Sequence, residues 1–288
     1  MAKALALGET MWQARRRLEA AGVESAGIDA QLIVEHVTGA TRLDLIARAD
    51  QSVTPEQAER IELMLGRRIA HEPVHRILGE REFYGLRMTL SSQTLEPRPD
   101  TETLVDAVVP FARSRSGGCR VLDLGTGTGA ILIAILAQAP KATGLAVDIS
   151  ADALATASRN ADLNGVAGRF DATQSDWFSN VVGRFDLIVS NPPYIPSSDV
   201  ENLAAEVRFF DPARALDGGG DGLDCYRTIA RSAGSHLADD GRIAVEIGYD
   251  QLDSVRALFE EHGFLCCEAR KDLDGNDRVL IFGQNRGL

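Results

Sequence analysis

The tetrapeptide at positions 191–194, Asn-Pro-Pro-Tyr, follows an apolar run at 187–189 that is typical of a buried strand. Asn191 offers a side-chain oxygen as a hydrogen-bond acceptor, and Pro192 offers a carbonyl without an N–H of its own. The ring of Pro193 restricts the residue before it and so fixes the direction of that carbonyl. Tyr194 adds a flat aromatic face. Such a group could hold a planar amide or amine, whereas the alternative is a stiff Pro-Pro turn that binds nothing.

The chemistry that this arrangement permits is methylation of a planar nitrogen. An amide NH2 is a poor nucleophile because its lone pair is delocalised into the carbonyl. Two acceptors that hold both N–H bonds would turn the lone pair toward a methyl donor. The tetrapeptide alone fits the exocyclic amine of adenine as well as a side-chain amide.

A glycine-rich turn, DLGTGTG at positions 123–129, is the second feature that could do chemistry. Glycines at alternate positions let the backbone approach a ligand closely, beside the N-terminus of the following helix. A dinucleotide fold favours G-x-G-x-x-G. This turn has G-x-G-x-G preceded by an aspartate, which resembles S-adenosylmethionine-dependent methyltransferases. The cofactor contacts expected in this turn are Asp123, Gly125, Thr126, Gly127, Thr128 and Gly129.

Two further strand ends carry side chains suited to a nucleoside. Asp148 follows the apolar run at 145–147, and a carboxylate there can accept from both ribose hydroxyls or can cap the next helix. Asp176 could accept from an exocyclic amine, while Trp177 or Phe178 could cover the adenine ring. The competing interpretation of these aromatic residues is a place in the core.

The elements that must position these residues alternate between strand and helix from Arg120 onward. Strands are predicted at 121–122, 145–147, 171–174, 187–189, 243–245, 265–269 and 279–282, most of them apolar, and helices at 130–138, 151–164, 226–237 and 252–261. Continuous apolar strands alternating with helices predict an α/β fold with a mostly parallel, seven-stranded sheet covered on both faces. No helix separates the last two strands, which predicts an antiparallel edge. Residues 96–288 therefore form a Rossmann-like domain, with a helix beginning near Thr101 after the prolines at 97 and 99.

The first 72 residues predict a small helical domain. Apolar residues recur at helical spacing between Thr10 and Gly22, which are placed to begin and end one helix. Thr54 to Gln57 has the pattern of a capping box with proline at the first helical position. Residues 73–95 change character and predict a β-hairpin linker that turns at Gly85.

Composition excludes several classes of function. A net charge of −12 disfavours a protein that works by holding a nucleic-acid backbone. No apolar run approaches twenty residues, and the opening residues lack a signal-peptide pattern. Four cysteines and five histidines show neither metal-ligand spacing nor a disulfide framework. We expect a cytoplasmic monomer that binds no metal, no nucleic acid and no membrane.

The two motifs together are similar to those of methyltransferases that modify exocyclic or amide nitrogens, which include DNA adenine and protein-glutamine methyltransferases. Nearly the whole chain resembles the release factor glutamine methyltransferase family (HemK type). The segments that carry this resemblance are HRILGEREFYG (75–85), PRPDTE (97–102), SDWF (175–178), ALDGGGDGLDCYR (215–227), VEIGYDQ (245–251) and KDLDGNDRV (271–279).

The resemblance implies methyl transfer from S-adenosylmethionine to the glutamine amide in the Gly-Gly-Gln loop of peptide-chain release factors. It implies cofactor contacts by the glycine turn, Asp148, Asp176, Trp177 and Asn191, and a grip on the glutamine by residues 191–194, with Asn191, Pro192 and Tyr194 as the catalytic residues. The helical domain would dock the release factor. Arg98 and Glu102 would line the entrance, or would form a salt bridge at the corner between the domains.

Direct in-line displacement without a covalent intermediate is the expected mechanism, with most of the catalysis supplied by positioning. The rival functions are methylation of a glutamine in a large-subunit ribosomal protein, DNA adenine methylation, nicotinamide oxidoreduction and non-catalytic nucleotide binding. DNA methylation would need a basic groove and a target-recognition region, and the sequence contains neither pattern. The glycine spacing and the Asn-Pro-Pro-Tyr motif count against the last two rivals.

Overall fold

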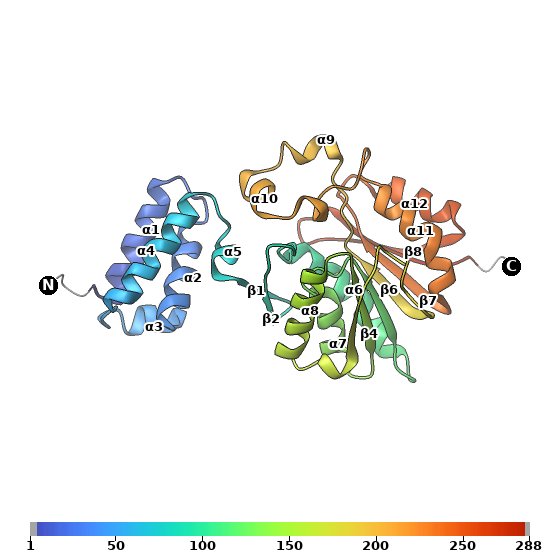
Figure 1. The fold of residues 1–288 in the computed structure, drawn as a ribbon, viewed down its shortest axis with the longest axis horizontal. Helices are drawn as coiled ribbons and strands as arrows, with labels where there is room; N and C mark the ends of the chain where they lie inside the picture. Colours follow the sequence, from blue (N-terminus) through green and yellow to red (C-terminus); the bar gives the residue numbers. More distant parts are fainter. Residues whose placement is uncertain (1–4, 286–288) are drawn as a thin grey trace. The chain divides into compact units, whose positions relative to one another are not determined.

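Residues 5–285 are described by a computed structural model (Figure 1). The outermost residues of the two predicted domains, 1–4 and 286–288, lie outside this range. The chain separates into two units, Met1–Gly79 and Glu80–Leu288. This boundary differs from the predicted hairpin linker at 73–95, because Val74–Leu78 forms a helix of the first unit and the hairpin strands belong to the second.

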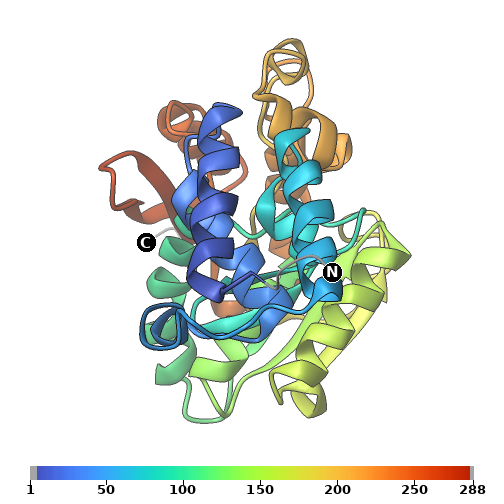
Figure 2. The same cartoon turned by 90° about the vertical axis from the view of Figure 1, so that its left-hand side faces the viewer.

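The first unit is helical, as predicted. Its helices are α1 (Leu7–Ala20), α2 (Ala26–Thr38), α3 (Arg42–Ala47), α4 (Pro55–Ile69) and α5 (Val74–Leu78). Helices α1, α2 and α4 pack side by side (Figure 2) around fully buried side chains such as Leu18, Ile33 and Leu65. Thr54 and Gln57 form the predicted capping box at the start of α4.

The first helix begins earlier than Thr10, so the predicted start was wrong. Helix α1 starts at Leu7, and the Thr10 hydroxyl donates to the Ala6 carbonyl from inside the helix. The Leu7 side chain is buried, and its N–H donates to the Gln51 carbonyl at 2.8 Å. Tertiary contacts therefore extend the helix beyond the position that its polar cap residue indicates.

The second unit opens with the predicted hairpin, β1 (Glu80–Phe83) and β2 (Leu86–Thr89), which turns at Gly85. Phe83 and Met88 are buried in the core of this unit. After it, a short 3-10 turn, η1 (Pro99–Thr101), leads into helix α6 (Glu102–Ser114), close to the predicted start. Thr101 lies at the start of α6, and its side chain is buried.

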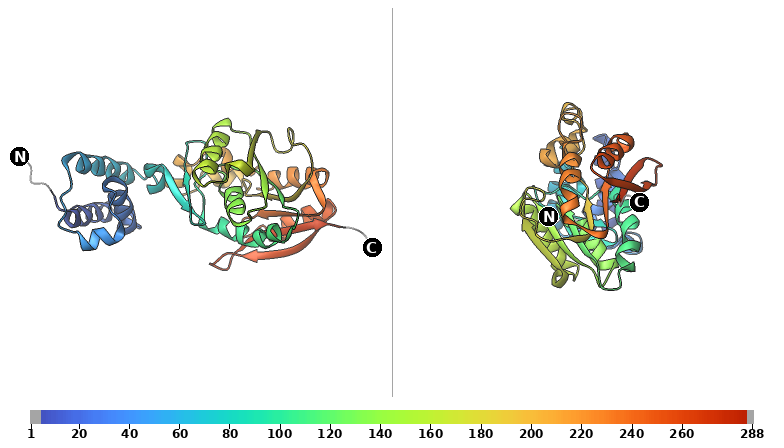
Figure 3. Two further views of the ribbon diagram at one scale, coloured as in Figure 1. Left: turned by 90° about the horizontal axis from the view of Figure 1, so that it is seen from below. Right: turned by 90° about the vertical axis from the view of Figure 1, so that its right-hand side faces the viewer.

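The sheet has seven strands in the order β5-β4-β3-β6-β7-β9-β8. They are β3 (Arg120–Leu124), β4 (Thr143–Asp148), β5 (Phe170–Gln174), β6 (Phe185–Ser190), β7 (Leu237–Glu246), β8 (Phe264–Lys271) and β9 (Asp277–Gln284). The first five are parallel, and β9 pairs antiparallel with both β7 and β8. The predicted antiparallel edge is confirmed (drawn in red in Figure 3).

Helices cover both faces of this sheet. They are α7 (Ala130–Gln138) and α8 (Ala151–Leu163) with α6 on one face, and α11 (Asp224–His236) with α12 (Leu252–Glu261) on the other (Figure 1). Alternate strand residues divide between the two cores: Val121 and Leu187 face one, while Leu122 and Ile188 face the other. Among the described residues, no helix has both the length and the apolar character needed to cross a bilayer.

The strand register brings the chemistry-bearing residues to one edge. Leu124 at the end of β3 pairs with Val147 of β4 and Ser190 of β6. The Ser190 hydroxyl also donates to the Leu124 carbonyl at 2.8 Å. The glycine turn, Asp148 and Asn191 therefore leave the sheet at the same level, as expected for the carboxyl ends of parallel strands.

Candidate active site

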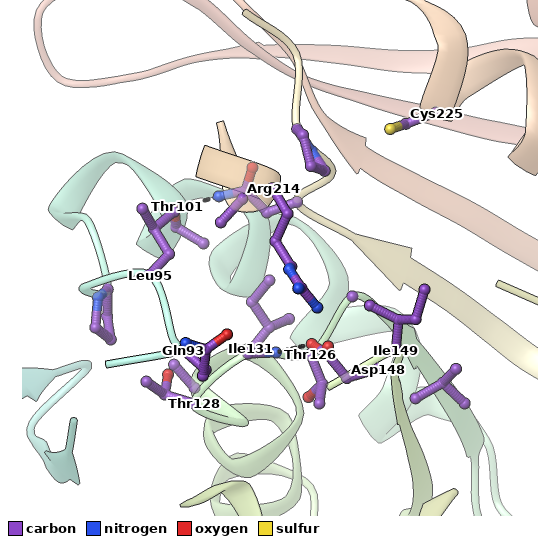
Figure 4. A pocket seen from close by; sticks show the side chains of 18 of the residues that line it. Gln93, Leu95, Thr101, Thr126, Thr128, Ile131, Asp148, Ile149, Arg214 and Cys225 are labelled. Atoms are coloured by element: carbon purple, nitrogen blue, oxygen red, sulfur yellow. Dashed lines mark hydrogen bonds between the residues drawn. The ribbon is translucent and has the colours of Figure 1, made fainter. Parts of the chain in front are cut away.

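A cavity of about 320 Å³ lies at this carboxyl edge (Figure 4). Its lining brings together residues from the hairpin exit to helix α11, all within the second unit. The predicted site residues that line it are Gly125, Thr126, Gly127, Thr128, Asp148, Asp176, Trp177, Asn191 and Pro193. Asp123, Gly129, Pro192 and Tyr194 do not line it, although each lies within two positions of a residue that does.

The glycine turn is shaped for a ligand. Gly125 and Gly127 have φ of 69° and 56°, which is the left-handed region that favours glycine. A Cβ added at either position would meet no heavy atom within 4 Å. Both positions border the cavity, so their missing side chains leave open space against which a flat or extended cofactor can lie. This cradle fits S-adenosylmethionine.

Gly129 serves a different purpose, because it allows close packing of helices. It has φ of 81°, and an added Cβ would lie 2.9 Å from the Ile133 Cδ1 atom and 3.0 Å from the Ala157 Cβ atom. The third glycine of the turn therefore permits α7 to begin directly against α8. It supports the cradle from behind, and the cofactor contact predicted for it stays a prediction.

Replacing Gly129 by alanine is expected to lower the free energy of unfolding by about 1–3 kcal/mol, through the strained φ and the crowded Cβ. Chemical denaturation of the wild type and the variant measures this difference. Gly220→Ala is the matched control, because Gly220 is exposed and an added Cβ there meets nothing within 4 Å. Equal losses in both variants would contradict the packing role of Gly129.

Asp123 lies beneath the turn and is fully buried. Its Oδ2 atom accepts from the Thr126 hydroxyl at 2.7 Å, and its Oδ1 atom has no hydrogen-bond partner among the described residues. Burial raises the pKa of Asp123 from 3.8 to about 7. The residue thus holds Thr126 in place, and the cofactor contact predicted for it stays a prediction.

The buried carboxyl of Asp123 predicts a pH-dependent stability. The folded state binds the Asp123 proton more tightly than the unfolded state does, because the pKa of this carboxyl is higher in the folded state. Protonated Asp123 therefore contributes fully to the free energy of unfolding below about pH 4, and this contribution is lost as the pH rises through 7. Asp123→Asn removes this titration and can still accept from Thr126. From pH 5 to pH 8, the unfolding free energy of the variant should therefore rise by about 2–3 kcal/mol relative to the wild type. Parallel urea curves at the two pH values, with an unchanged difference, would contradict the assignment.

Asp148 is held by the backbone on both sides. Its Oδ2 atom accepts from the Gly127 N–H and its Oδ1 atom from the Ser150 N–H, each at 2.9 Å. Each carboxylate oxygen retains a lone pair for one further donor. Asp148 lines the cavity (Figure 4), so a ribose that lies there can donate to both oxygens. Capping of helix α8, the alternative role that the sequence left open for Asp148, belongs to Ser150, which accepts from the Ala153 N–H.

The structure gives different places to Trp177 and Phe178, for which the sequence left open whether each covers the adenine ring or lies in the core. Trp177 lines the cavity, whereas Phe178 is buried in the core and stacks on His236 with ring centroids 4.9 Å apart. Trp177 has φ of 48°, an uncommon conformation for a residue with a bulky side chain. Asp176 also lines the cavity, from the adjacent position.

Asn191 lies where β6 ends, with its amide nitrogen already engaged. The Nδ2 atom donates to the Thr101 Oγ1 atom at 3.1 Å. This bond orients the amide, so that its Oδ1 atom remains available as an acceptor. Among the described residues, no hydrogen bond reaches the Pro192 carbonyl either. Two acceptors therefore stand next to each other at this strand end.

Tyr194 packs against the core rather than lining the cavity. Its carbonyl accepts from the Gln251 Nε2 atom at 3.0 Å, which anchors the end of the tetrapeptide. Burial, together with the charge of Glu246, raises the pKa of the Tyr194 phenol to about 12. The Tyr194 ring thus remains neutral at physiological pH.

Arg98 and Glu102 have separate partners. Arg98 donates to the buried Asp211 carboxylate at 2.6 Å, and Glu102 accepts from the Tyr84 N–H at 2.8 Å. The salt bridge between them that the sequence suggested as an alternative is therefore not formed. Arg98 lines the cavity, whereas Glu102 fastens α6 to the hairpin.

Sequence reasoning missed three polar residues of the site. Thr101 orients Asn191, Glu246 lies buried beside them, and Arg214 points into the cavity (Figure 4). Glu246 had a readable signal, since it directly follows the apolar strand residues 243–245, at the edge where ligands bind. Thr101 and Arg214 lie in the short 3-10 turns η1 and η3 (Ala213–Ala215), and their convergence on the cavity has no local sequence signal.

The strand order, the glycine cradle, the acidic end of β4 and the Asn-Pro-Pro-Tyr end of β6 define an S-adenosylmethionine-dependent methyltransferase. Comparisons with known proteins agree. The PrmC N-terminal domain profile matches residues 9–79, and the methyltransferase small domain profile matches residues 101–223. The solved structure of a methyltransferase from Pyrococcus furiosus shares the fold, with a TM-score of 0.54, 20% identity, and coverage of 76% of this chain and 97% of that chain.

Curated relatives give the narrower assignment. The release factor glutamine methyltransferase of Agrobacterium fabrum is 53% identical over 93% of this chain and 94% of its own length. That of Rhodospirillum rubrum is 47% identical over 96% of this chain and 85% of its own length. This chain belongs to the release factor glutamine methyltransferase family.

Proposed function

We propose that this chain methylates the side-chain amide nitrogen of the glutamine in the Gly-Gly-Gln motif of peptide-chain release factors. S-adenosyl-L-methionine would be the methyl donor and S-adenosyl-L-homocysteine the product. The observation that carries this proposal is the orientation of Asn191. Its Nδ2 atom is committed to Thr101, so an acceptor oxygen is presented beside the free carbonyl of Pro192.

The cofactor would lie along the cavity that follows the glycine turn. When bound, it would supply a methyl group from its sulfonium. Asp148 would accept from the ribose hydroxyls, and Trp177 would cover the adenine while Asp176 accepts from its amine. Arg214 carries a positive charge suited to the methionyl carboxylate.

The substrate amide would be held by its two N–H bonds. The Asn191 Oδ1 atom and the Pro192 carbonyl would accept one each, which withdraws those hydrogens from the side on which the lone pair reacts. Pro193, which lines the cavity, would limit the pocket to a planar group, and the Tyr194 ring would support it from the core side. A side-chain amide satisfies both acceptors, whereas a hydroxyl or a thiol leaves one of them unpaired at a cost of about 1–3 kcal/mol.

Positioning would supply most of the rate enhancement, and no covalent enzyme intermediate is needed. The two acceptors carry partial negative charge, so they interact more strongly as the substrate nitrogen becomes positive. The methylated amide then loses a proton readily to water.

The helical unit, residues 5–79 of the described chain, would dock the body of the release factor. Several large apolar side chains are exposed on it: Trp12, Ile28, Leu43, Ile46 and Leu63. In that complex these side chains would supply apolar contacts to the partner.

Transfer of labelled methyl groups tests the proposed function. The protein is incubated with labelled S-adenosylmethionine and a purified release factor, and then with a release factor whose loop glutamine is replaced by alanine. Label is expected only in the first protein. Equal label in both would contradict the glutamine target. Label that appears in ribosomal proteins or DNA, but not in the release factor, would support a rival function.

A further inference from the structure

Glu246 is a buried acid at the end of β7 that the proposed function does not use. Its side chain is almost wholly removed from solvent, and its Oε2 atom has no hydrogen-bond partner among the described residues. Leaving such an atom without a partner in the core costs about 1–3 kcal/mol or more, so a chain that keeps a glutamate here gains something from it. The position of Glu246 in the sheet indicates which role of the carboxylate offsets this cost.

The register places Glu246 next to Asn191. Ser190 of β6 pairs with Val245 of β7, so the residues that follow them, Asn191 and Glu246, leave adjacent strands at the same level. Thr101 and Asn191 lie close enough to Glu246 for their hydrogen bonding to lower its pKa against the raising effect of burial. Glu246 therefore belongs to the group of side chains that surrounds the end of β6.

Thr101 is hydrogen-bonded to the Asn191 amide and also lowers the pKa of Glu246. The Thr101 Oγ1 atom accepts from the Asn191 Nδ2 atom at 3.1 Å, and its own hydroxyl proton must be donated elsewhere. Thr101 lowers the pKa of Glu246, as a donor to its carboxylate does, so an ionised Glu246 would accept that proton. With the proton committed to Glu246, Thr101 can only accept from Asn191, and the Asn191 Oδ1 atom must face the other way.

We infer that Glu246 is a positioning residue, whose carboxylate acts through the Thr101 hydroxyl to hold the Asn191 amide with its oxygen toward the substrate. This inference rests on the proposed acceptor role of Asn191. A positioning role differs from mere filling of space, because the effect of Glu246 then depends on the direction of a hydrogen bond. Protonation of Glu246 would reverse that direction and allow the Asn191 amide to turn over.

The surroundings of Glu246 make its protonation accessible near neutral pH. Burial, and to a smaller extent the charge of Asp100, raises the pKa of Glu246, while Thr101, Arg278 and Asn191 lower it. The net result is a pKa of about 7 in place of 4.5. The other titratable groups that face it are Tyr194 and Tyr226, whose phenols remain neutral. The ionised form, which holds Asn191 in the productive orientation, is lost as the pH falls below about 7.

Steady-state methylation of a release factor tests the inference with three variants. Glu246→Leu and Thr101→Val each remove one member of the relay, and kcat is expected to fall on the order of 100-fold, the loss typical of a misplaced group. The Kd for S-adenosylmethionine should stay within about twofold, because both variants leave the glycine turn and Asp148 unchanged. Glu246→Gln keeps an acceptor for Thr101, so it should retain more activity than Glu246→Leu and lose the inflection of kcat near pH 7.

Two comparisons separate a relay from a structural role. The double variant, which combines Glu246→Leu with Thr101→Val, should be no slower than either single variant, because both substitutions break the same chain of hydrogen bonds. Thr101→Ser restores the hydroxyl and should recover most of the activity lost in Thr101→Val.

Several results would overturn the positioning role. These are wild-type kcat in Glu246→Leu, multiplicative losses in the double variant, or an unchanged pH profile in Glu246→Gln. If Glu246→Leu does not fold, the Glu246→Gln profile and the Thr101 pair decide the question. A wild-type protein that fails to methylate the release factor refutes the proposed function instead.

Discussion

Replacing Asn191 by alanine is expected to lower kcat for methyl transfer by about 10²- to 10³-fold, the effect of removing one preorganised polar group from a reacting centre. The variant loses the acceptor oxygen that Thr101 holds toward the substrate. Cofactor affinity should largely persist, because the cradle and Asp148 are untouched. Single-turnover methylation measures the first effect, and calorimetric titration with S-adenosylmethionine measures the second.

Asn276→Ala is the matched control for this variant, because Asn276 is exposed in the turn between β8 and β9. It should behave as the wild type in both measurements. Full activity in Asn191→Ala would refute the acceptor role. A large loss of cofactor affinity with normal single-turnover rates would move Asn191 from the substrate grip to the cofactor site.

The second large effect is expected for Asp148→Ala, which should raise the Kd for S-adenosylmethionine by at least about 100-fold. A hydrogen bond to a charged group contributes about 1.5–3 kcal/mol, and two ribose hydroxyls would donate to this carboxylate. The variant also frees the Gly127 N–H, which Asp148 now holds at 2.9 Å. The glycine cradle should lose order as well as a ligand contact.

Asp152→Ala removes the same charge from an exposed position in the first turn of α8 and should leave the Kd unchanged. Both variants should keep kcat within about tenfold of the wild type when the cofactor is saturating, since uniform binding affects KM rather than kcat. An unaltered Kd in Asp148→Ala would rule out its contact with the cofactor.

Much of the fold could be predicted from the sequence because its strands, turns and helix starts depend on neighbouring residues. Apolar strands such as 187–189 are continuous because helices cover both faces, and the helix that starts at Ala130 directly follows the glycine turn. The strand ends therefore identify the edge at which Asp148 and Asn191 meet, without knowledge of any tertiary contact. The capping box of Thr54 likewise needs only neighbouring residues.

Features that depend on tertiary contacts could not be predicted. Helix α1 begins at Leu7 because the chain near Gln51 pairs with it, and α5 belongs to the helical unit because Val74 and Leu78 pack into the core of that unit. The choice between Trp177 and Phe178 depends on the backbone conformation of Trp177 and on stacking against His236, far away in sequence.

The same limit applies to the polar partners of the site. Thr101 is hydrogen-bonded to Asn191, which lies 90 positions away in the sequence, and Arg98 pairs with Asp211 rather than with the nearby Glu102. Only Glu246 could have been found, since it continues a predicted strand at the ligand-binding edge.

The most direct measurement is peptide mass spectrometry of a release factor incubated with the protein and S-adenosylmethionine. We predict one added methyl group on the amide nitrogen of the glutamine in the Gly-Gly-Gln loop, and a strongly reduced yield with Asn191→Ala. A methyl group on any other residue, or the same yield with both enzymes, would contradict the site described here.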